Sequence, residues 1–202
     1  MKVIKFENET EWLEARRGKI SGTRLKDLIV KRGTGKKIGY YELIAERLAI
    51  APDGENCMDR GHRLEEEAIE LLSKELGIKF EDGLEIWVRE DNESIIISPD
   101  GHAEKLTLGA EAKCLGSARH IEALLTNKIP NEYWEQVLQY FIVNDKLKVL
   151  YFVFYDPRIL AKPFFFFEVK REDVQAQVDE YLELERTTLA EIDEIVLRLS
   201  DF

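Results

Sequence analysis

The stretch "SIIISPDGHAEKLTLGAEAKC", residues 94–114, decides the fold because two apolar runs flank one short polar turn. Both runs have the residue types of strands, so they predict a hairpin that turns after Lys105. In that register Asp100 lies directly opposite Glu111. Side chains alternate along a strand, so Lys113 shares the face of Glu111. The stretch therefore predicts two carboxylates and a lysine in one place.

Two facing carboxylates favour a bound cation. Like charges directly opposite each other destabilise a sheet, and carboxylates at the margin of a core cost more unless a cation lies between them. Phosphodiester hydrolysis needs Mg²⁺ held by oxygen ligands, and a nearby lysine that positions the attacking water. Asp100 and Glu111 suit the first task, and Lys113 suits the second. The alternative is a polar turn followed by a half-exposed strand, and the spacing alone does not choose between them.

A glutamate on a predicted helix adds to this set. In "RLEEEAIELL", residues 63–72, Glu65 has Ala68, Ile69 and Leu72 on its own side of the helix. Its carboxylate therefore borders the apolar face and needs a partner, such as a metal ion or a water. The alternative is a boundary glutamate whose carboxylate reaches solvent.

A glutamine on a later helix has a similar position. In "NEYWEQVLQYFIV", residues 131–143, Gln136 lies between Tyr133 and Tyr140 on one helical face. Its amide serves a phosphate or a water in one reading, and only a neighbouring side chain in the other.

The hydrophobic pattern of the whole chain predicts an α/β (α+β) fold. The expected helices are 9–17, 21–31, 39–50, 59–76, 117–126, 131–144 and 171–202. The expected strands are 84–89, 94–98, 109–115, 148–156 and 164–169. The third and fourth strands are separated by two helices, so a helical crossover fits between them. The last helix is amphipathic and suits core or partner contact.

Composition limits the class of protein. The chain has 202 residues, of which 45% are hydrophobic and 34% charged, so it fits one globular domain. No apolar run approaches the ~20 residues of a membrane span, and we expect a soluble, cytoplasmic protein. Cys57 and Cys114 belong to no metal-binding pattern, and we expect both to be reduced thiols.

A basic segment interrupts an acidic chain. Residues 16–37 hold nine Lys or Arg against one acid, a net charge of +8, so −19 falls on the rest of the −11 chain. A net negative charge repels nucleic acid except where basic groups gather. The segment is either a track for DNA phosphates or a solvated helix face.

Six motifs, in this order, resemble the phage lambda-type alkaline exonucleases, or YqaJ-like viral recombinases, of the PD-(D/E)xK nuclease superfamily. They are "RRGKISGT", "RGHRLEEEAI", "SPDG", "EAK", "EYWEQVLQY" and "YFVFYDPR", and the likeness spans about residues 9–170. The resemblance implies a restriction-endonuclease-like core, in which helices flank a mixed central sheet. It also implies one exonuclease domain, with a DNA-end-binding part at about 1–57, a nuclease core at about 58–170 and a C-terminal helix at about 171–202.

The resemblance also implies roles for individual residues. The metal ligands are expected to be Asp100, Glu111, the main-chain carbonyl of Ala112 and, at a second metal, Glu65. Lys113 would activate water, and Gln136 would be the helical glutamine of the site unless a shifted register puts Gln139 there. The 5′-phosphate of the DNA end would be bound by Arg16, Thr23 and Ser98. Further DNA contacts are expected from Arg17, which competes with Arg16 for the phosphate, and from Lys19 and Arg24.

The function implied by the resemblance is a 5′-to-3′ exonuclease that uses Mg²⁺ or Mn²⁺. It would degrade double-stranded DNA from 5′-phosphorylated ends to mononucleotides and leave a 3′ single strand. The family's enzymes form homotrimeric rings and work with a single-strand annealing protein, in phages or prophages of bacterial hosts. The alternatives are another nuclease of the same fold, a non-catalytic DNA-end-binding module and an acidic protein-interaction domain.

Overall fold

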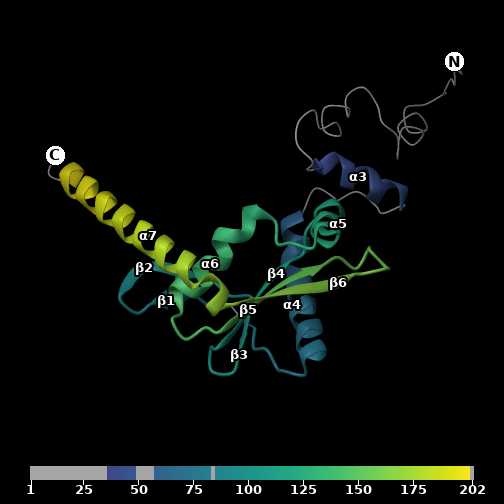
Figure 1. Cartoon of the computed structure of the whole chain (residues 1–202), viewed down its shortest axis with the longest axis horizontal. Coiled ribbons are helices and arrows are strands. Elements are labelled where there is room, and N and C mark those ends of the chain that lie inside the picture. The colour runs from purple at the N-terminus through teal and green to yellow at the C-terminus, as the bar shows by residue number, and fades with distance from the viewer. Residues whose placement is uncertain (1–35, 49–56, 83–84, 201–202) are drawn as a thin grey trace, which may run out of the picture.

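The computed structural model describes residues 36–48, 57–82 and 85–200 (Figure 1). The predicted helices 9–17 and 21–31, and nearly all of the basic segment, lie outside these residues. The described elements, in chain order, are α3 (Ile38–Arg47), α4 (Cys57–Leu76), β1 (Trp87–Arg89), β2 (Asn92–Ile97), β3 (Gly101–Ala103), β4 (Leu108–Lys113), α5 (Ser117–Thr126), the 3₁₀ helix η1 (Asn131–Tyr133), α6 (Trp134–Val143), β5 (Val149–Tyr155), β6 (Phe164–Lys170) and α7 (Arg171–Ser200).

The main sheet has four strands in the order β3-β4-β5-β6. Strands β4 and β5 run parallel, and the outer pairs β3/β4 and β5/β6 are antiparallel, so the sheet is mixed. The parallel pair requires a crossover, which α5, η1 and α6 provide as the sequence predicts. The predicted fold class, a mixed sheet flanked by helices, is confirmed.

Helices cover both faces of this sheet (Figure 1). Phe152 and Phe154 of β5 join the apolar cluster that includes α6 and the start of α7. Tyr151 and Val153 point to the opposite face and join the cluster that includes α4. Because both faces are covered, β5 reads as a continuous apolar run and was predicted nearly to its ends.

The hairpin predicted within residues 94–114 has the expected register but is shorter than predicted. Residues 101–103 pair with 108–110 in the expected register, with Gly101 opposite Ala110. Residues 94–97 do not join this hairpin, because β2 pairs with β1 in a separate two-stranded sheet. The physical reason lies at Pro99, which has no N–H for a sheet ladder and restricts the residue before it. The chain therefore leaves one sheet at Ser98 and enters the other after Asp100.

The turn of this hairpin is wider than predicted and is strained. Glu104, Lys105 and Leu106 have φ angles of 50°, 57° and 69°, in the left-handed region that side chains rarely adopt. Two contacts hold the turn in place. Thr107 Oγ1 donates to the carbonyl of Glu104 at 3.0 Å, and Asn144 Nδ2 donates to the carbonyl of Leu106 at 2.8 Å.

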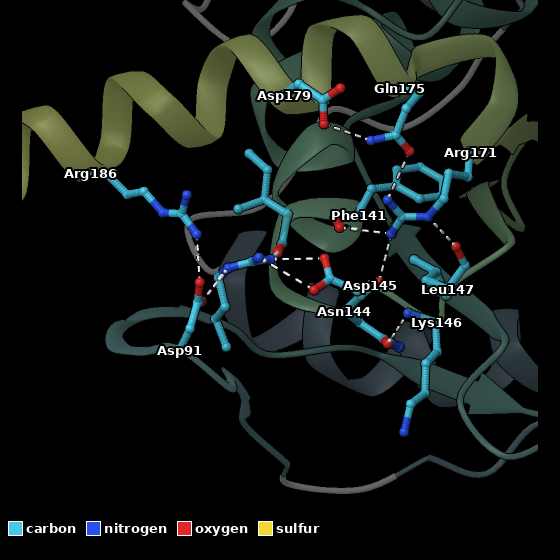
Figure 2. A network of polar contacts seen from close by, with 12 residues as sticks. Asp91, Phe141, Asn144, Asp145, Lys146, Leu147, Arg171, Gln175, Asp179 and Arg186 are labelled. Atoms are coloured by element: carbon cyan, nitrogen blue, oxygen red, sulfur yellow. Dashed lines mark hydrogen bonds and ion pairs between the residues drawn. The ribbon is translucent and has the colours of Figure 1, made fainter.

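Two arginines close the end of α6, the helix that carries Gln136 (Figure 2). Arg89 donates to the carbonyl of Ile142, and Arg171 donates to the carbonyls of Phe141 and Asn144 at 2.8 and 2.6 Å. The last carbonyls of a helix have no partner within it, so these side chains supply the donors that are missing. Arg89 thereby ties the end of α6 to β1, and Arg171 ties it to the start of α7.

The "YFVFYDPR" motif ties the end of β5 to the start of α5. Ser117 Oγ donates to Asp156 Oδ2 at 2.6 Å, and Arg158 Nε donates to Asp156 Oδ1 at 2.8 Å. Asp156 is fully buried, so these donors offset the cost of its charge.

The long C-terminal helix is confirmed and leads away from the body of the domain (Figure 1). Val174 and Val178, in its first half, are buried in the core. In the described part of the chain, no helix is both long and apolar enough to cross a membrane.

Candidate active site

Asp100 is held against the strand that carries the other predicted residues. It immediately precedes β3, and its Oδ2 accepts a hydrogen bond of 2.7 Å from the main-chain N–H of Ala112 on β4. Glu111 and Lys113 flank Ala112 and share one face of β4, as strand alternation predicts. The structure therefore brings Asp100, Glu111 and Lys113 together at one end of the hairpin.

Glu111 is the centre of a polar cluster inside the protein, with only 2% of its surface exposed. Gln136 Nε2 donates to its Oε1 at 2.6 Å, and the Lys113 ammonium contacts the same oxygen. The Tyr140 hydroxyl donates to Oε2 at 2.5 Å. Both carboxylate oxygens therefore have donors, as a buried carboxylate requires.

The negative charges of Asp100 and Glu111 repel each other in this buried site. Burial, followed by the nearby charge of Glu111, raises the pKa of Asp100 to about 7, although the Ala112 N–H acts in the opposite direction. The charge of Glu65 also raises this pKa, which places Glu65 close enough to act on the site from α4. Gly101 leaves room for α4, because a Cβ there would lie 3.2 Å from a methyl carbon of Ile69, one helical turn after Glu65, and that side chain would have to shift by a few tenths of an ångström.

These groups fit a magnesium ion. Among the described residues, no three His, Cys, Asp or Glu side chains gather in a metal-binding cluster. The donors at hand are instead the carboxylates of Asp100 and Glu111, with the main chain of Ala112 between them. Mg²⁺ prefers such oxygen ligands and commonly binds through one or two carboxylates, with waters and substrate phosphates completing its shell. A cation here would also offset the repulsion that raises the pKa of Asp100.

Lys113 has a second neighbour that the sequence analysis did not assign to the site. Its Nζ lies 5.7 Å from the centre of the Tyr133 ring, within the range of a cation–π contact. Burial, followed by the charge of Glu132, raises the pKa of Tyr133 to about 12. The Tyr133 hydroxyl therefore stays neutral, and the face of the ring stabilises the Lys113 ammonium.

The other predicted site residues divide into three groups. Gln136 contacts Glu111, whereas Gln139 donates to the carbonyl of Ile96 at 3.3 Å, so the geometry favours Gln136. Ser98 is exposed in the segment that leads to Asp100. The predicted DNA-binding residues that lie outside the described residues are Arg16, Arg17, Lys19, Thr23 and Arg24.

Tyr140 is the main residue that sequence reasoning missed. The signal was its position four residues after Gln136, since residues at that spacing share a helical face. Cys114 is buried and forms no disulfide, and the Cys57 side chain lies outside the described residues.

Comparison with solved structures defines the class of fold. The chain is similar to an alkaline exonuclease, LHK-Exo, from Laribacter hongkongensis, with 26% identity and a TM-score of 0.62 over 95% of this chain and 97% of that one. The same enzyme in complex with dAMP matches with 26% identity and a TM-score of 0.61, over the same shares. This is the fold of an alkaline exonuclease.

A comparison with models of protein families identifies the family of this chain. The YqaJ-like viral recombinase domain matches residues 11–146, and the chain belongs to this family. A search of curated proteins gives no match. The resemblance drawn from the six motifs is therefore confirmed at the level of the family.

Proposed function

We propose that the protein is a Mg²⁺-dependent exonuclease that degrades double-stranded DNA in the 5′-to-3′ direction and releases mononucleotides. The observation that carries this proposal is the convergence of Asp100, Glu111 and Lys113, with Gln136 bonded to Glu111. The fold, which is similar to that of an alkaline exonuclease, supports the same chemistry.

The chain's own residues divide the catalytic work. Asp100, Glu111 and the carbonyl of Ala112 would hold the metal, and Glu65 would assist at a second position. When bound, the metal neutralises negative charge that develops on the phosphate. Lys113 orients the attacking water and favours its deprotonation through its positive charge. Manganese, which accepts the same oxygen ligands, is the alternative ion.

A terminal phosphate pocket would set the direction of digestion. Arg16, Thr23 and Ser98 would bind the 5′-phosphate, and Arg17, Lys19 and Arg24 would contact the neighbouring backbone. Fixing the end of the strand in this way places the first phosphodiester bond at the carboxylates. The complex of the relative with dAMP supports a mononucleotide product.

Assembly and partners extend the proposal. A homotrimeric ring would enclose the duplex, with the basic segment 16–37 lining it and the acidic remainder of the chain outside. The 3′ single strand would pass to a single-strand annealing protein for recombination. A phage or prophage origin agrees with the viral recombinase family.

End-labelled duplexes test the reaction directly. We expect digestion from 5′-phosphorylated ends with Mg²⁺, slow digestion from 5′-hydroxyl ends and none with a chelator. Asp100→Ala and Lys113→Ala should abolish digestion, while Lys170→Ala, at an exposed lysine on β6, should not. Equal rates at both kinds of end would count against the phosphate pocket and favour another nuclease of this fold. DNA binding without cleavage would favour the end-binding module.

A further inference from the structure

The hydroxyl of Tyr140 contacts the buried acid of the candidate site. It donates to Glu111 Oε2 at 2.5 Å. It also approaches the carbonyl of Ala110 at 3.3 Å. One oxygen atom therefore contacts both the main chain of β4 and its buried carboxylate.

The Tyr140 ring has little freedom to move. The side chain is fully buried, and its ring packs edge-on against Trp87 with the ring centres 6.1 Å apart. It also lies beside Gly109, where an added Cβ would be 3.6 Å from a ring carbon. The hydroxyl is thus held in place by the core before any ligand binds.

The direction of the hydrogen bond to Glu111 is also fixed. The hydroxyl has one proton for a hydrogen bond, and the Glu111 carboxylate at 2.5 Å lies closer than the Ala110 carbonyl at 3.3 Å. A carboxylate can only accept, so the hydroxyl is the donor.

Among the described contacts of Glu111, Tyr140 has a distinct role. Gln136 and Lys113 both contact Oε1, whereas Tyr140 contacts Oε2. Without the hydroxyl, the carboxylate could turn about its last bond while keeping its other two donors. The orientation of both oxygens therefore depends on the tyrosine.

We propose that Tyr140 is a positioning residue that fixes the Glu111 carboxylate in the orientation that binds a divalent cation. It acts through Glu111 and does not touch the substrate. This inference rests on the proposed nuclease function. It means that a residue on the buried face of α6 affects the affinity of the site for the metal. Groups that orient metal ligands in this way commonly change affinity or activity by about 10- to 100-fold when removed.

The test is Tyr140→Phe, which removes one oxygen and keeps the ring. We expect the Mg²⁺ concentration for half-maximal activity to rise by about 10- to 100-fold. The rise in Tm on adding Mg²⁺ should move to higher concentration by the same factor. Tyr155→Phe is the matched control, because Tyr155 is also buried and its hydroxyl donates to the carboxylate of Glu67 at 3.0 Å, outside the described contacts of Glu111. It should leave both Mg²⁺ responses unchanged.

The outcomes separate this inference from the proposed function. If Tyr140→Phe lowers Tm but leaves both Mg²⁺ responses at wild-type values, the tyrosine is only structural and the inference is wrong. If the wild type digests no DNA, the proposed function fails, and the Mg²⁺-dependent Tm of the two proteins still decides the role of Tyr140. Should Tyr140→Phe not fold, fluorotyrosine at position 140 keeps the shape and changes the hydroxyl's acidity. An altered Mg²⁺ requirement would then support the inference, and an unaltered one would overturn it.

Discussion

The main-chain N–H of Ala112 donates to Asp100 Oδ2 at 2.7 Å, so one acidic side chain is tied to the strand that carries the other. The hydrogen bond keeps Asp100 near Glu111 although their charges repel, and burial, followed by this repulsion, raises the pKa of Asp100 to about 7. The site therefore stores unfavourable energy when no cation is bound.

Asp100→Asn should stabilise the protein at alkaline pH in the presence of a chelator. An acid whose folded-state pKa is raised loses stability as pH rises from its ordinary pKa of 3.8 to the folded-state value of about 7, so the loss is complete at alkaline pH, and Asn carries no charge to repel Glu111. We expect Tm to rise by about 2–4 °C, the change that ~1 kcal/mol gives in a chain of this size. Mg²⁺ should then raise the Tm of the wild type but not of the variant. A variant no more stable than the wild type would show that the two carboxylates do not repel each other.

Lys113→Met should lower the rate of DNA cleavage by about two orders of magnitude or more, because the group that activates the water is lost. Lys170→Met, at an exposed lysine paired with Glu168, serves as the control. Single-turnover digestion with saturating Mg²⁺ measures the chemical step. If cleavage persists in Lys113→Met at the rate of the control, another group activates the water.

His120 should contribute a loss of stability as pH drops below about 6.5, opposite in sign to the gain that Asp100 contributes over the same range. The His120 side chain is fully buried, and desolvation lowers its pKa below the ordinary 6.5, with Arg158 adding to the effect and Asp156 and the Lys162 carbonyl opposing it. Below 6.5 the unfolded chain takes up a proton that the folded protein resists, so the free energy of unfolding decreases. The slope from one such group is at most about 1.4 kcal/mol per pH unit.

Urea denaturation across this range measures that slope. His120→Gln has no imidazole to protonate, so the difference between its slope and that of the wild type measures the His120 contribution, and the variant should lose less stability, or gain more, between neutral and mildly acid pH. An unchanged slope in the variant would assign the effect to other groups.

Leu106→Asn should raise the free energy of unfolding by about 1 kcal/mol. Leu106 has a φ of 69°, which disfavours a leucine and which Asn tolerates, while Asn144 holds the same main-chain carbonyl. Chemical denaturation gives the comparison. Leu125→Asn, at an exposed leucine on α5, is the control and should not stabilise the protein.

Arg171→Met should destabilise the protein by about 2–3 kcal/mol, because the buried carbonyls at the end of α6 lose a charged donor (Figure 2). Arg186→Met is matched to it on the same helix. The ion pair of Arg186 with Asp91 is exposed on both sides, so its loss should cost less than about 1 kcal/mol. Equal losses in both variants would contradict the capping role of Arg171.

Much of the fold was accessible from the sequence because its central elements are buried. The strand predicted at 148–156 is observed as Val149–Tyr155, and the helix predicted at 117–126 has those same bounds. Continuous apolar runs and helical periodicity predict such elements without any knowledge of the tertiary structure. Strand β3 was harder, because residues 101–103 form a three-residue strand whose sequence, Gly-His-Ala, has no strand preference.

The site was predictable where local geometry sets it. Asp100, Glu111 and Lys113 are related by strand pairing and alternation, which the sequence encodes over short range. The contact of Tyr140 with Glu111 spans 29 residues and depends on how the crossover returns to the sheet. The preference for Gln136 over Gln139 has the same origin, because only tertiary packing decides which side of α6 faces the sheet.

The crossover between β4 and β5 also has a consequence during protein synthesis. A ribosome makes Asp100, Glu111 and Lys113 well before it reaches Gln136 and Tyr140, which hold Glu111 in the finished structure. The nascent chain therefore carries the acidic residues and the lysine for a time without the groups that orient them. If the protein is the proposed nuclease, its activity arises only after α6 has left the ribosome and packed against the sheet. An incomplete chain would therefore do little damage to nearby DNA.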